Sequence, residues 1–389
     1  MSLRIDPNLR KEVAEFGGGD IDKCMNCGNC TAICPLSKGS TVFPRKVIRC
    51  LQLGLTEKLL QSPEPWLCYY CGECSQTCPR EANPGETMMA ARRYLTSQYD
   101  WTGLSKKLYI SKVWEVGAVL VVALIVVALF YFLHGPMLTE LTEEGGVQLN
   151  VFAPAKWVEV GDWSMAVILS FFLLTNAYRM YRSILGGEKG LKIPLSIYVK
   201  EFKTLVLHGL TQIRWQECGE SSLRWIKHLL LVSAYGTMFI LVVVFLRWFQ
   251  TDEIYPFYHP QRLLGYYATF VLLYVTADFM IGRLRKRDEI HKHSHPTDWI
   301  FLILLFLTTL TGILVHVFRI LGLPFSTYYM FVIHLAVAVP MLVIEVPFGK
   351  WAHLGYRPLA IYLTTVIEKA KEVSTAESVA PEGVVASTS

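Results

Sequence analysis

Eight of the ten cysteines lie between Cys24 and Cys78, in two runs with the same spacing. The first run holds Cys24, Cys27, Cys30 and Cys34, followed by Pro35, and the second holds Cys68, Cys71, Cys74 and Cys78, followed by Pro79. Three closely spaced thiolates can hold three corners of an iron–sulfur cubane from one loop. Gly28 and Gly72 let the backbone turn tightly around such a cluster. The doubled run therefore predicts two [4Fe–4S] clusters.

In a doubled run of this type, the fourth cysteine points away from its own loop and ligates the other cluster. This crossing assigns Cys24, Cys27, Cys30 and Cys78 to the first cluster, and Cys68, Cys71, Cys74 and Cys34 to the second. A pair of zinc sites is the alternative, but zinc usually takes two CxxC pairs rather than two complete four-cysteine runs. Cys50 and Cys218 lie outside the runs, and we expect both to be packing residues.

The opening sixteen residues, MSLRIDPNLRKEVAEF, have no apolar core, so no signal peptide is expected. Clustered cysteines in a reducing compartment are typical of metal ligands rather than disulfides. The stretch between the runs, residues 41–54, has Pro44 near one end, Gly54 at the other and apolar residues at helical spacing. The connector is therefore predicted to be helical. The basic residues of segment 86–112 are expected to face lipid phosphate at a membrane surface.

Six segments are long and apolar enough to span a hydrocarbon core of ~30 Å. They run approximately over residues 113–133, 164–185, 229–249, 263–282, 299–320 and 328–346. The sequence thus predicts an all-α protein, with a two-cluster α-helical ferredoxin domain followed by a six-helix transmembrane haem-b bundle. The expected boundaries are 1–105 for the cluster domain, 106–358 for the membrane domain and 359–389 for a cytoplasmic tail, disordered from about Ala370.

Lysine and arginine counts predict the orientation. The 134–163 loop has one lysine and several acids, whereas the 186–228 and 283–298 loops are rich in lysine and arginine. Both termini and the cysteine domain are therefore expected on the cytoplasmic side. This loop bias explains the net charge of +5, so no nucleic-acid partner is expected.

Histidines within apolar helices are usually functional. His228 and His353 fall at the cytoplasmic ends of their segments, and His316 and His334 fall near the outer ends. Two depths of paired imidazoles are what two haems b would need. The expected pairs are His228 with His353 and His316 with His334, with His134 as an alternative outer ligand. The His291, His293 and His295 stretch could bind metal, but a solvated loop is the preferred interpretation.

The cluster part, about 90 residues, resembles the iron–sulfur subunit of heterodisulfide reductase and, more broadly, the α-helical ferredoxins. The membrane part resembles the cytochrome b subunits of heterodisulfide reductase and respiratory nitrate reductase. The likeness is carried by residues 334–353, which end in PFGKWAH, and by RWIKHLLL at residues 224–231. Met238 stands where the nitrate reductase pattern has a second histidine, which is why His316 is assigned to the outer pair.

The fusion of the two parts resembles the C subunits of the quinone-interacting membrane-bound oxidoreductase complexes of sulfate reducers. This resemblance implies a bacterial cytoplasmic membrane protein bound to two flavin and iron–sulfur subunits of the heterodisulfide reductase A type. It also implies menaquinone as substrate and electron transfer between menaquinol and adenylylsulfate reductase. The alternatives are membership of a heterodisulfide-reductase-type or sulfite-reduction-linked complex, and a redox sensor or membrane anchor without turnover.

The outer loop of residues 252–262 is the expected quinol site. His259 has a suitable pKa range to accept a proton, and Asp252 or Glu253 could pass it outward. A solvated loop packed by its aromatic residues is the plainer interpretation. An inner site beside residues 193–215, lying along the membrane with His208 inward, is the other location considered.

Overall fold

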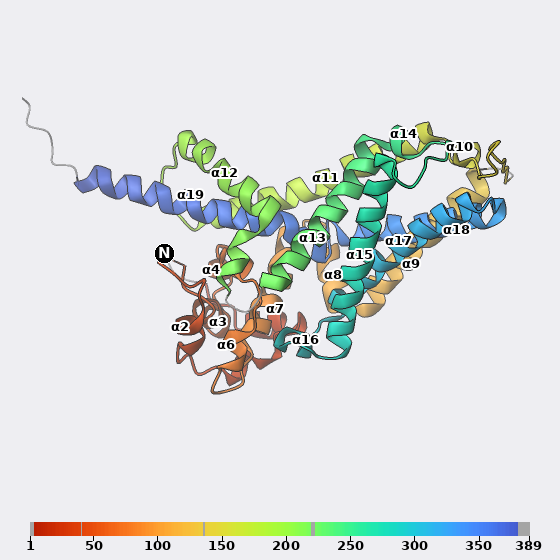
Figure 1. Ribbon diagram of the computed structural model, residues 1–389. Coiled ribbons are helices and arrows are strands. Elements are labelled where there is room, and N and C mark those ends of the chain that lie inside the picture. Colours follow the sequence, from red (N-terminus) through yellow and green to blue (C-terminus); the bar gives the residue numbers. More distant parts are fainter. Residues whose placement is uncertain (1–3, 40, 135–136, 219–221, 380–389) are drawn as a thin grey trace, which may run out of the picture. The chain divides into compact units, whose positions relative to one another are not determined.

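Helices make up the regular structure of this chain, as the sequence predicts. A computed structural model describes residues 4–39, 41–134, 137–218 and 222–379 (Figure 1). Within these ranges the β structure is limited to one bridge between Leu141 and Val147. The chain forms two compact units: unit 1 holds residues 1–92, 177–219 and 353–389, and unit 2 holds residues 93–176 and 220–352. The all-α prediction is confirmed.

Unit 1 begins with short helices around the cysteine runs. They are α1 (Leu9–Glu15), η1 (Gly19–Lys23), α2 (Asn29–Ile33), α3 (Arg45–Gln52), α4 (Thr56–Leu60), α5 (Glu64–Leu67), α6 (Glu73–Gln76) and the start of α7 (Pro84–Tyr99). The predicted connector helix is α3. Gly54 follows it with φ +66°, and a Cβ there would lie 2.2 Å from the Asp6 carbonyl oxygen. Only glycine can therefore end this helix against the amino-terminal segment.

Two later segments complete unit 1. These are α12 (Leu195–Thr211) with the following 3-10 helix η2 (Ile213–Glu217), and α19 (His353–Val379). Helices α12 and α19 lie side by side (Figure 1), with Ile197, Val366 and Ala370 buried between them. Residues 370–379, predicted to be disordered, are helical here. Their two alanines, one lysine and two glutamates are good helix formers, and the stretch continues a helix already anchored by packing. Residues 380–389 lie outside the described part of the chain.

Unit 2 contains the long apolar helices. Its elements are α8 (Leu104–Ile110), α9 (Lys112–Leu133), α10 (Leu149–Phe152), α11 (Ala155–Gly186, shared with unit 1 beyond residue 176), α13 (Ser222–Phe239), α14 (Leu246–Phe249), α15 (Pro260–Leu284), α16 (Glu289–Lys292), α17 (Pro296–Ile320), α18 (Pro324–Pro340) and the 3-10 helix η5 (Lys350–Ala352). Helices α13 and α18 each continue into a π-helical turn, η3 (Ile240–Val244) and η4 (Met341–Glu345). Pro340, inside the helical run, precedes the second π-turn.

Six described helices are long and apolar enough to cross a membrane: α9, α11, α13, α15, α17 and α18. They coincide with the six predicted segments. The most apolar stretch of α11 has no residue buried inside the protein, and that of α9 has few. Such apolar faces need lipid to cover them. The arrangement is that of a multi-pass membrane protein.

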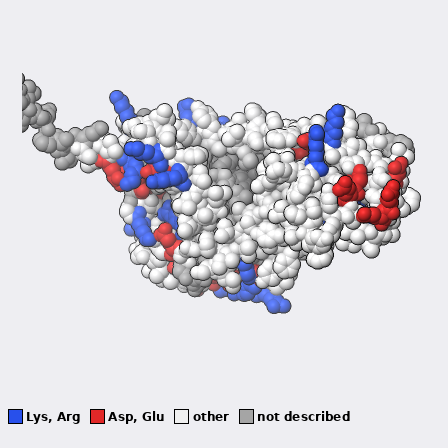
Figure 2. Space-filling view, turned by 45° about the horizontal axis from the view of Figure 1, so that its top comes forward, with Lys and Arg blue, Asp and Glu red and all other residues white. Residues whose placement is uncertain are grey.

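The long helices of unit 2 pack in neighbouring pairs: α17 with α18, α13 with α15, α15 with α17, and α9 with α18. At the α10 end, a core cluster gathers Phe152, Val315, Tyr328 and Phe331. Figure 2 shows acidic side chains gathered at this end, where Glu140, Glu143 and Glu144 are exposed. The basic segment between α15 and α17 lies at the other end of these helices. The two ends therefore carry opposite charge.

Candidate functional site

The two cysteine loops have the same backbone turn. Asn26 and Gly28 have φ of +58° and +92°, and Tyr70 and Gly72 have φ of +55° and +94°. In each loop the second residue after the first cysteine donates its backbone N–H to that cysteine's sulfur, at 3.4 Å for Asn26 and 3.3 Å for Tyr70. Left-handed residues placed this way fold each loop around its sulfur atoms.

The thiols gather into two groups that draw on both runs. Cys30 interacts electrostatically with Cys24, Cys27 and Cys78, whereas Cys74 interacts most with Cys68, Cys71 and Cys34. Helices α2 and α6, which follow the two loops, contact each other, and Asn29 Nδ2 donates to the Thr77 carbonyl oxygen at 2.7 Å. The structure thus brings together, in each group, the four cysteines that the crossed assignment names. We call them the first group (Cys24, Cys27, Cys30, Cys78) and the second group (Cys34, Cys68, Cys71, Cys74).

The second group lines a cavity together with Phe43, Tyr69 and Cys218. Burial raises the pKa of the Cys34 thiol to about 12, and burial also raises the pKa of Cys68 and Cys74. Contact with the Cys218 thiol lowers the pKa of Cys71 to about 7. Buried thiols that resist ionisation are stable as thiolates only when cationic iron binds them. Four convergent cysteines around a cavity therefore fit a [4Fe–4S] cluster.

Two arginines hold the backbone of the second group. The guanidiniums of Arg92 and Arg357 both donate to the Cys68 carbonyl oxygen, the latter at 3.3 Å. The Arg357 guanidinium also lies 4.4 Å from the centre of the Tyr69 ring. Burial lowers the pKa of Arg357. These groups place positive charge next to the second group.

Sequence reasoning missed Arg357 and treated Cys218 as a packing residue. Arg357 lies on α19 and Cys218 follows η2, so both are far from the two cysteine runs in the sequence. One signal was available: residues 356, 360, 363 and 367 are apolar at helical spacing, and all four are buried. This pattern predicts that the start of α19 packs against protein rather than forming a free tail.

The four candidate haem ligands lie on the long helices or at their ends. His228 is a half-buried residue of α13 in unit 2, and His353 is the first residue of α19 in unit 1. His334, on α18, has its Nδ1 atom 3.0 Å from the Thr311 hydroxyl of α17. A Cβ at Gly312 would lie 3.2 Å from the His334 ring, so this glycine leaves space for the imidazole. Metal-binding histidines characteristically have one ring nitrogen held in this way.

His316 and His134 have different surroundings. On His316, Nδ1 lies 2.6 Å from Arg262 Nη1, and Nε2 lies 3.0 Å from both this atom and the Tyr266 hydroxyl. His134 Nε2 hydrogen-bonds to the Phe152 carbonyl oxygen. In this arrangement both ring nitrogens of His316 face hydrogen-bonding partners. His334 and His134 thus each have one ring nitrogen held by a hydrogen bond to a single neighbour, whereas His316 has contacts on both nitrogens.

The outer-loop candidates lie around the start of α15. Asp252 accepts hydrogen bonds from the backbone and side-chain nitrogens of Asn150, at 3.0 and 2.9 Å, and Glu253 is exposed. His259 immediately precedes α15 and stacks on Tyr255, with ring centres 4.0 Å apart. Its Nδ1 atom is buried and finds no hydrogen-bond partner among the described residues. His208, the inner-site candidate, is half-buried on α12, and burial lowers its pKa.

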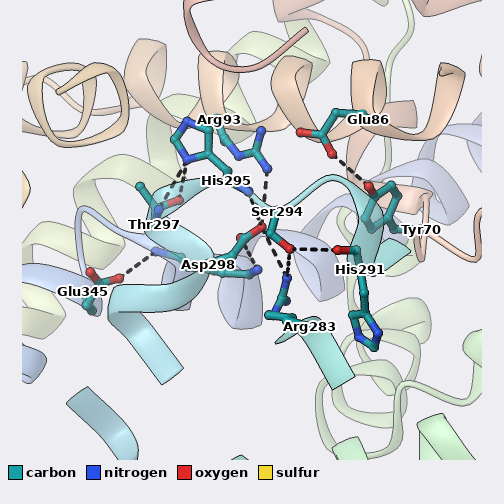
Figure 3. Close-up of polar contacts among 11 residues, drawn as sticks. Tyr70, Glu86, Arg93, Arg283, His291, Ser294, His295, Thr297, Asp298 and Glu345 are labelled. Carbon is teal, nitrogen blue, oxygen red and sulfur yellow. Dashed lines mark hydrogen bonds and ion pairs between the residues drawn. The ribbon is translucent and has the colours of Figure 1, made fainter. Parts of the chain in front are cut away.

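A charged network that the sequence did not predict lies at the start of α17 (Figure 3). Asp298 accepts a hydrogen bond from the Lys350 ammonium and lies 3.6 Å from Arg93 and 3.9 Å from Arg283. His295 caps the helix, accepting from the Thr297 backbone at 3.4 Å. Burial lowers the pKa of His295 to about 4, so it is a neutral acceptor at pH 7.

Figure 3 also shows that His291 and His295 point in different directions. Across the described part of the chain, no three histidine, cysteine or acidic side chains are arranged to hold a single metal ion. His295 instead serves as a helix cap and His291 pairs with Asp288 at 3.5 Å. The polar network therefore links α7, α15, α17 and the segment before α19 within unit 2.

Residues 20–82 match the 4Fe-4S dicluster domain family. The chain is 41% identical over 104 residues to a heterodisulfide reductase C-like protein of Archaeoglobus profundus, over 25% of this chain and 55% of that protein. It is 30% identical over 88 residues to the C subunit of the H2:CoB–CoM heterodisulfide, ferredoxin reductase of Methanothermobacter thermautotrophicus, over 23% of this chain and 48% of that protein. It is 36% identical over 72 residues to the iron-sulfur C subunit of the CoB–CoM heterodisulfide reductase of Methanopyrus kandleri, over 18% of this chain and 38% of that protein.

The chain thus spans about half the length of the first of these relatives. No solved structure shows significant similarity to it. The chain carries an amino-terminal 4Fe–4S dicluster domain, and its similar proteins are iron–sulfur subunits of the heterodisulfide reductase C type.

Proposed function

We propose that this chain is the membrane subunit of a respiratory quinol oxidoreductase complex. It passes electrons between menaquinone and cytoplasmic partner subunits, with two haems b and two [4Fe–4S] clusters as cofactors. One observation carries the proposal: a dicluster domain and six helices able to cross a membrane occur in one chain. A soluble electron carrier needs no such helices, and a simple anchor needs no half-buried histidines inside them.

The proposed cluster ligands are the first and second groups as defined above. Their support is the gathering of four thiols from both runs in each group. The chain's own role is to hold the thiolates, to exclude water from the second group and to set the surrounding charge. A [4Fe–4S] cluster accepts and gives up one electron at a time.

The proposed haem ligands are His228 with His353, and His316 with His334. The Thr311 hydroxyl beside His334 Nδ1 supports His334, because it would fix the ring with Nε2 directed elsewhere. The contacts of His316 with Arg262 and Tyr266 make it the weakest of the four, with His134 as its alternative. Substituting His353 by alanine is expected to remove one haem and leave the other, as seen in the reduced haem absorbance. Retention of both haems would refute this pairing.

The proposed location is a bacterial cytoplasmic membrane with both termini inside. The acidic α10 end of unit 2 then faces outward, and the basic segment 283–292 faces the cytoplasm.

The proposed site of quinol oxidation is the outer loop. His259, whose buried Nδ1 has no partner among the described residues, would accept the proton, and Asp252 or Glu253 would pass it outward. The cytoplasmic partners would be flavin and iron–sulfur subunits of the heterodisulfide reductase A type. These subunits would pass the electrons on to adenylylsulfate reductase.

A second candidate function rests on the similar proteins themselves. Their names place them in heterodisulfide reductases, so this chain could serve a heterodisulfide-type or sulfite-reduction-linked partner with the same membrane part. The two candidates differ in the soluble partner and share the membrane chemistry.

The decisive experiment is the reduction of the purified chain by a menaquinol analogue, followed by haem absorbance. Rapid reduction supports quinol reactivity, and its loss in His259→Ala supports the outer site, with Tyr258→Phe as the matched control. In vesicles, an outer site makes reduction sensitive to an imposed membrane potential, because electrons cross the membrane. Potential-independent reduction with unchanged His259→Ala activity would move the site to the inner side, near His208. No reduction by any quinol analogue would reject the proposed function.

A further inference from the structure

Cys218 belongs to the cavity of the second group although it lies outside both cysteine runs. It follows η2 directly, is 1% exposed and lines the cavity with Cys34, Cys68, Cys71 and Cys74. It faces the same cavity as Cys71, and the two thiols interact electrostatically. The second group thus has a fifth sulfur beside its four proposed ligands.

The segment that carries Cys218 is attached to both cysteine loops. Trp215 packs against Tyr69 of the second run, with ring centres 5.5 Å apart. Arg214 donates to the Leu36 carbonyl oxygen, just after the first run, at 3.4 Å. Lys38 and Glu217 form an ion pair at 2.8 Å, with both side chains partly exposed.

The turn before this segment is held as well. Gln212 has φ +47°, is 3% exposed, and its side-chain oxygen accepts a hydrogen bond from Arg357 at 3.4 Å. The same arginine donates to the Cys68 carbonyl oxygen. Residues 212–218 are therefore fixed against the second group from several sides, and the place of Cys218 follows from these contacts.

A cubane has four irons, and the proposed second group already supplies four thiolates. A fifth buried thiol then has no iron to bind, but it has one hydrogen to donate. Hydrogen bonds to the sulfur atoms of a cluster stabilise the extra negative charge of its reduced form and so raise its reduction potential. Cys71 is the acceptor that the geometry offers.

We propose that Cys218 is a positioning residue for the second cluster, whose S–H donates to the Cys71 sulfur and raises the reduction potential of that cluster. The proposal rests on the ligand assignment given under the proposed function. No bond is made or broken and no further reactant is needed. The hydrogen bond separates the potentials of two clusters that are held by cysteine runs of identical spacing.

The test is a redox titration of both clusters in the full-length chain, followed by electron paramagnetic resonance. In Cys218→Ala, the equilibrium constant for reduction of the second cluster is expected to fall by up to tenfold, about 59 mV for a one-electron couple. The first cluster should not change. Cys218→Ser retains a donor and should fall between the wild type and Cys218→Ala. Cys50→Ala, at a buried cysteine on α3 away from both groups, is the matched control and should shift neither cluster.

A spectroscopic signature separates a hydrogen bond from a packing effect. In water, the reduced second cluster should show a proton coupling from the Cys218 S–H. This coupling should disappear in deuterium oxide, and it should be absent in Cys218→Ala. Unchanged potentials and unchanged coupling in Cys218→Ala, with full iron content, would overturn the proposal. Loss of about four irons in this variant would overturn it too, since Cys218 would then be a ligand. The ligand assignment fails separately if Cys71→Ala retains both clusters.

Discussion

The two cysteine groups share one loop geometry but have unlike surroundings. In the first group Cys30 is buried, Cys24 and Cys78 are half-buried and Cys27 is exposed. In the second group Cys68 and Cys74 are buried, Cys34 and Cys71 are half-buried, and none is exposed. The guanidiniums of Arg92 and Arg357 donate to the backbone of the second group. The sequence runs that bind the clusters are therefore equivalent, whereas the environments that set their properties are not.

This difference teaches that identical ligand spacing can yield two unequal redox centres. Nearby positive charge favours the reduced, more negative state of a cluster, and it acts more strongly where water is excluded. We therefore expect the second cluster to have the higher potential and to be reduced first. The first cluster, nearer to solvent, is the one that an outside electron carrier could reach.

The largest effect should come from breaking the crossing between the groups. Cys34→Ala is expected to remove the second cluster, about half of the cluster iron, because the proposed crossed assignment makes its thiolate the fourth ligand of that cluster. Cys78→Ala should remove the first cluster instead. The iron content and the electron paramagnetic resonance spectra of the reduced state show which cluster each variant has lost. If each variant lost the cluster of its own run, the crossed assignment would be wrong.

The next effect is a difference in the rate of cluster loss. Under air or an iron chelator, the first cluster should bleach several-fold faster than the second, because its Cys27 is exposed. Following the two reduced-state signals over time checks this expectation. Simultaneous loss would mean that burial of the second group gives no protection. Cys34→Ala provides the reference trace for the first cluster alone.

A smaller effect should follow from removing single charges. Arg357→Gln is expected to lower the second cluster's potential by the equivalent of about 1–2 kcal/mol, since a buried charge is poorly screened. Arg45→Gln is the matched control. The Arg45 side chain lies 3.6 Å from the Cβ position of Gly28 in the first loop and is exposed, so water should screen most of its charge. Equal shifts in the two variants would contradict the difference in environment.

The smallest effect concerns a hydrogen bond between the second loop and α7. The Tyr70 hydroxyl donates to Glu86 Oε2 at 2.9 Å, and Glu86 is 8% exposed. Tyr70→Phe removes this bond and should cost about 1 kcal/mol. Both groups belong to unit 1, so both cluster signals should be lost about 2–4 °C lower on heating. A fall in the second-cluster signal alone would mean that the two groups melt separately and would sharpen the difference between them.

Much of this could be predicted from the sequence because the signals are local. A cysteine run determines its loop through the spacing of a few residues. A membrane-spanning helix is recognised from the length of its apolar segment. The connector helix α3 was predicted because Pro44, Gly54 and the apolar spacing lie within one stretch. Each of these features depends on residues that are close together in the sequence.

The rest depends on contacts between distant segments. Arg357 and Cys218 reach the second group only after α12 and α19 fold back onto it. The apolar spacing at the start of α19 predicts that this helix packs against protein, but it does not say which segment it packs against. The network around Asp298 similarly combines Arg93, Arg283 and Lys350 from three parts of the chain. Single charged residues near helix ends look like surface residues in the sequence. Their burial becomes evident only in three dimensions.

The position of Arg357 has a consequence for biosynthesis. All eight cysteines of the two runs emerge from the ribosome early, but the arginine that holds the Cys68 carbonyl lies close to the end of the chain. At about 5–20 residues per second, it follows on the order of tens of seconds later. The six apolar helices are synthesised in that interval. The second site can therefore reach its final form only after the membrane helices exist, which ties maturation of that cluster to synthesis of the membrane part.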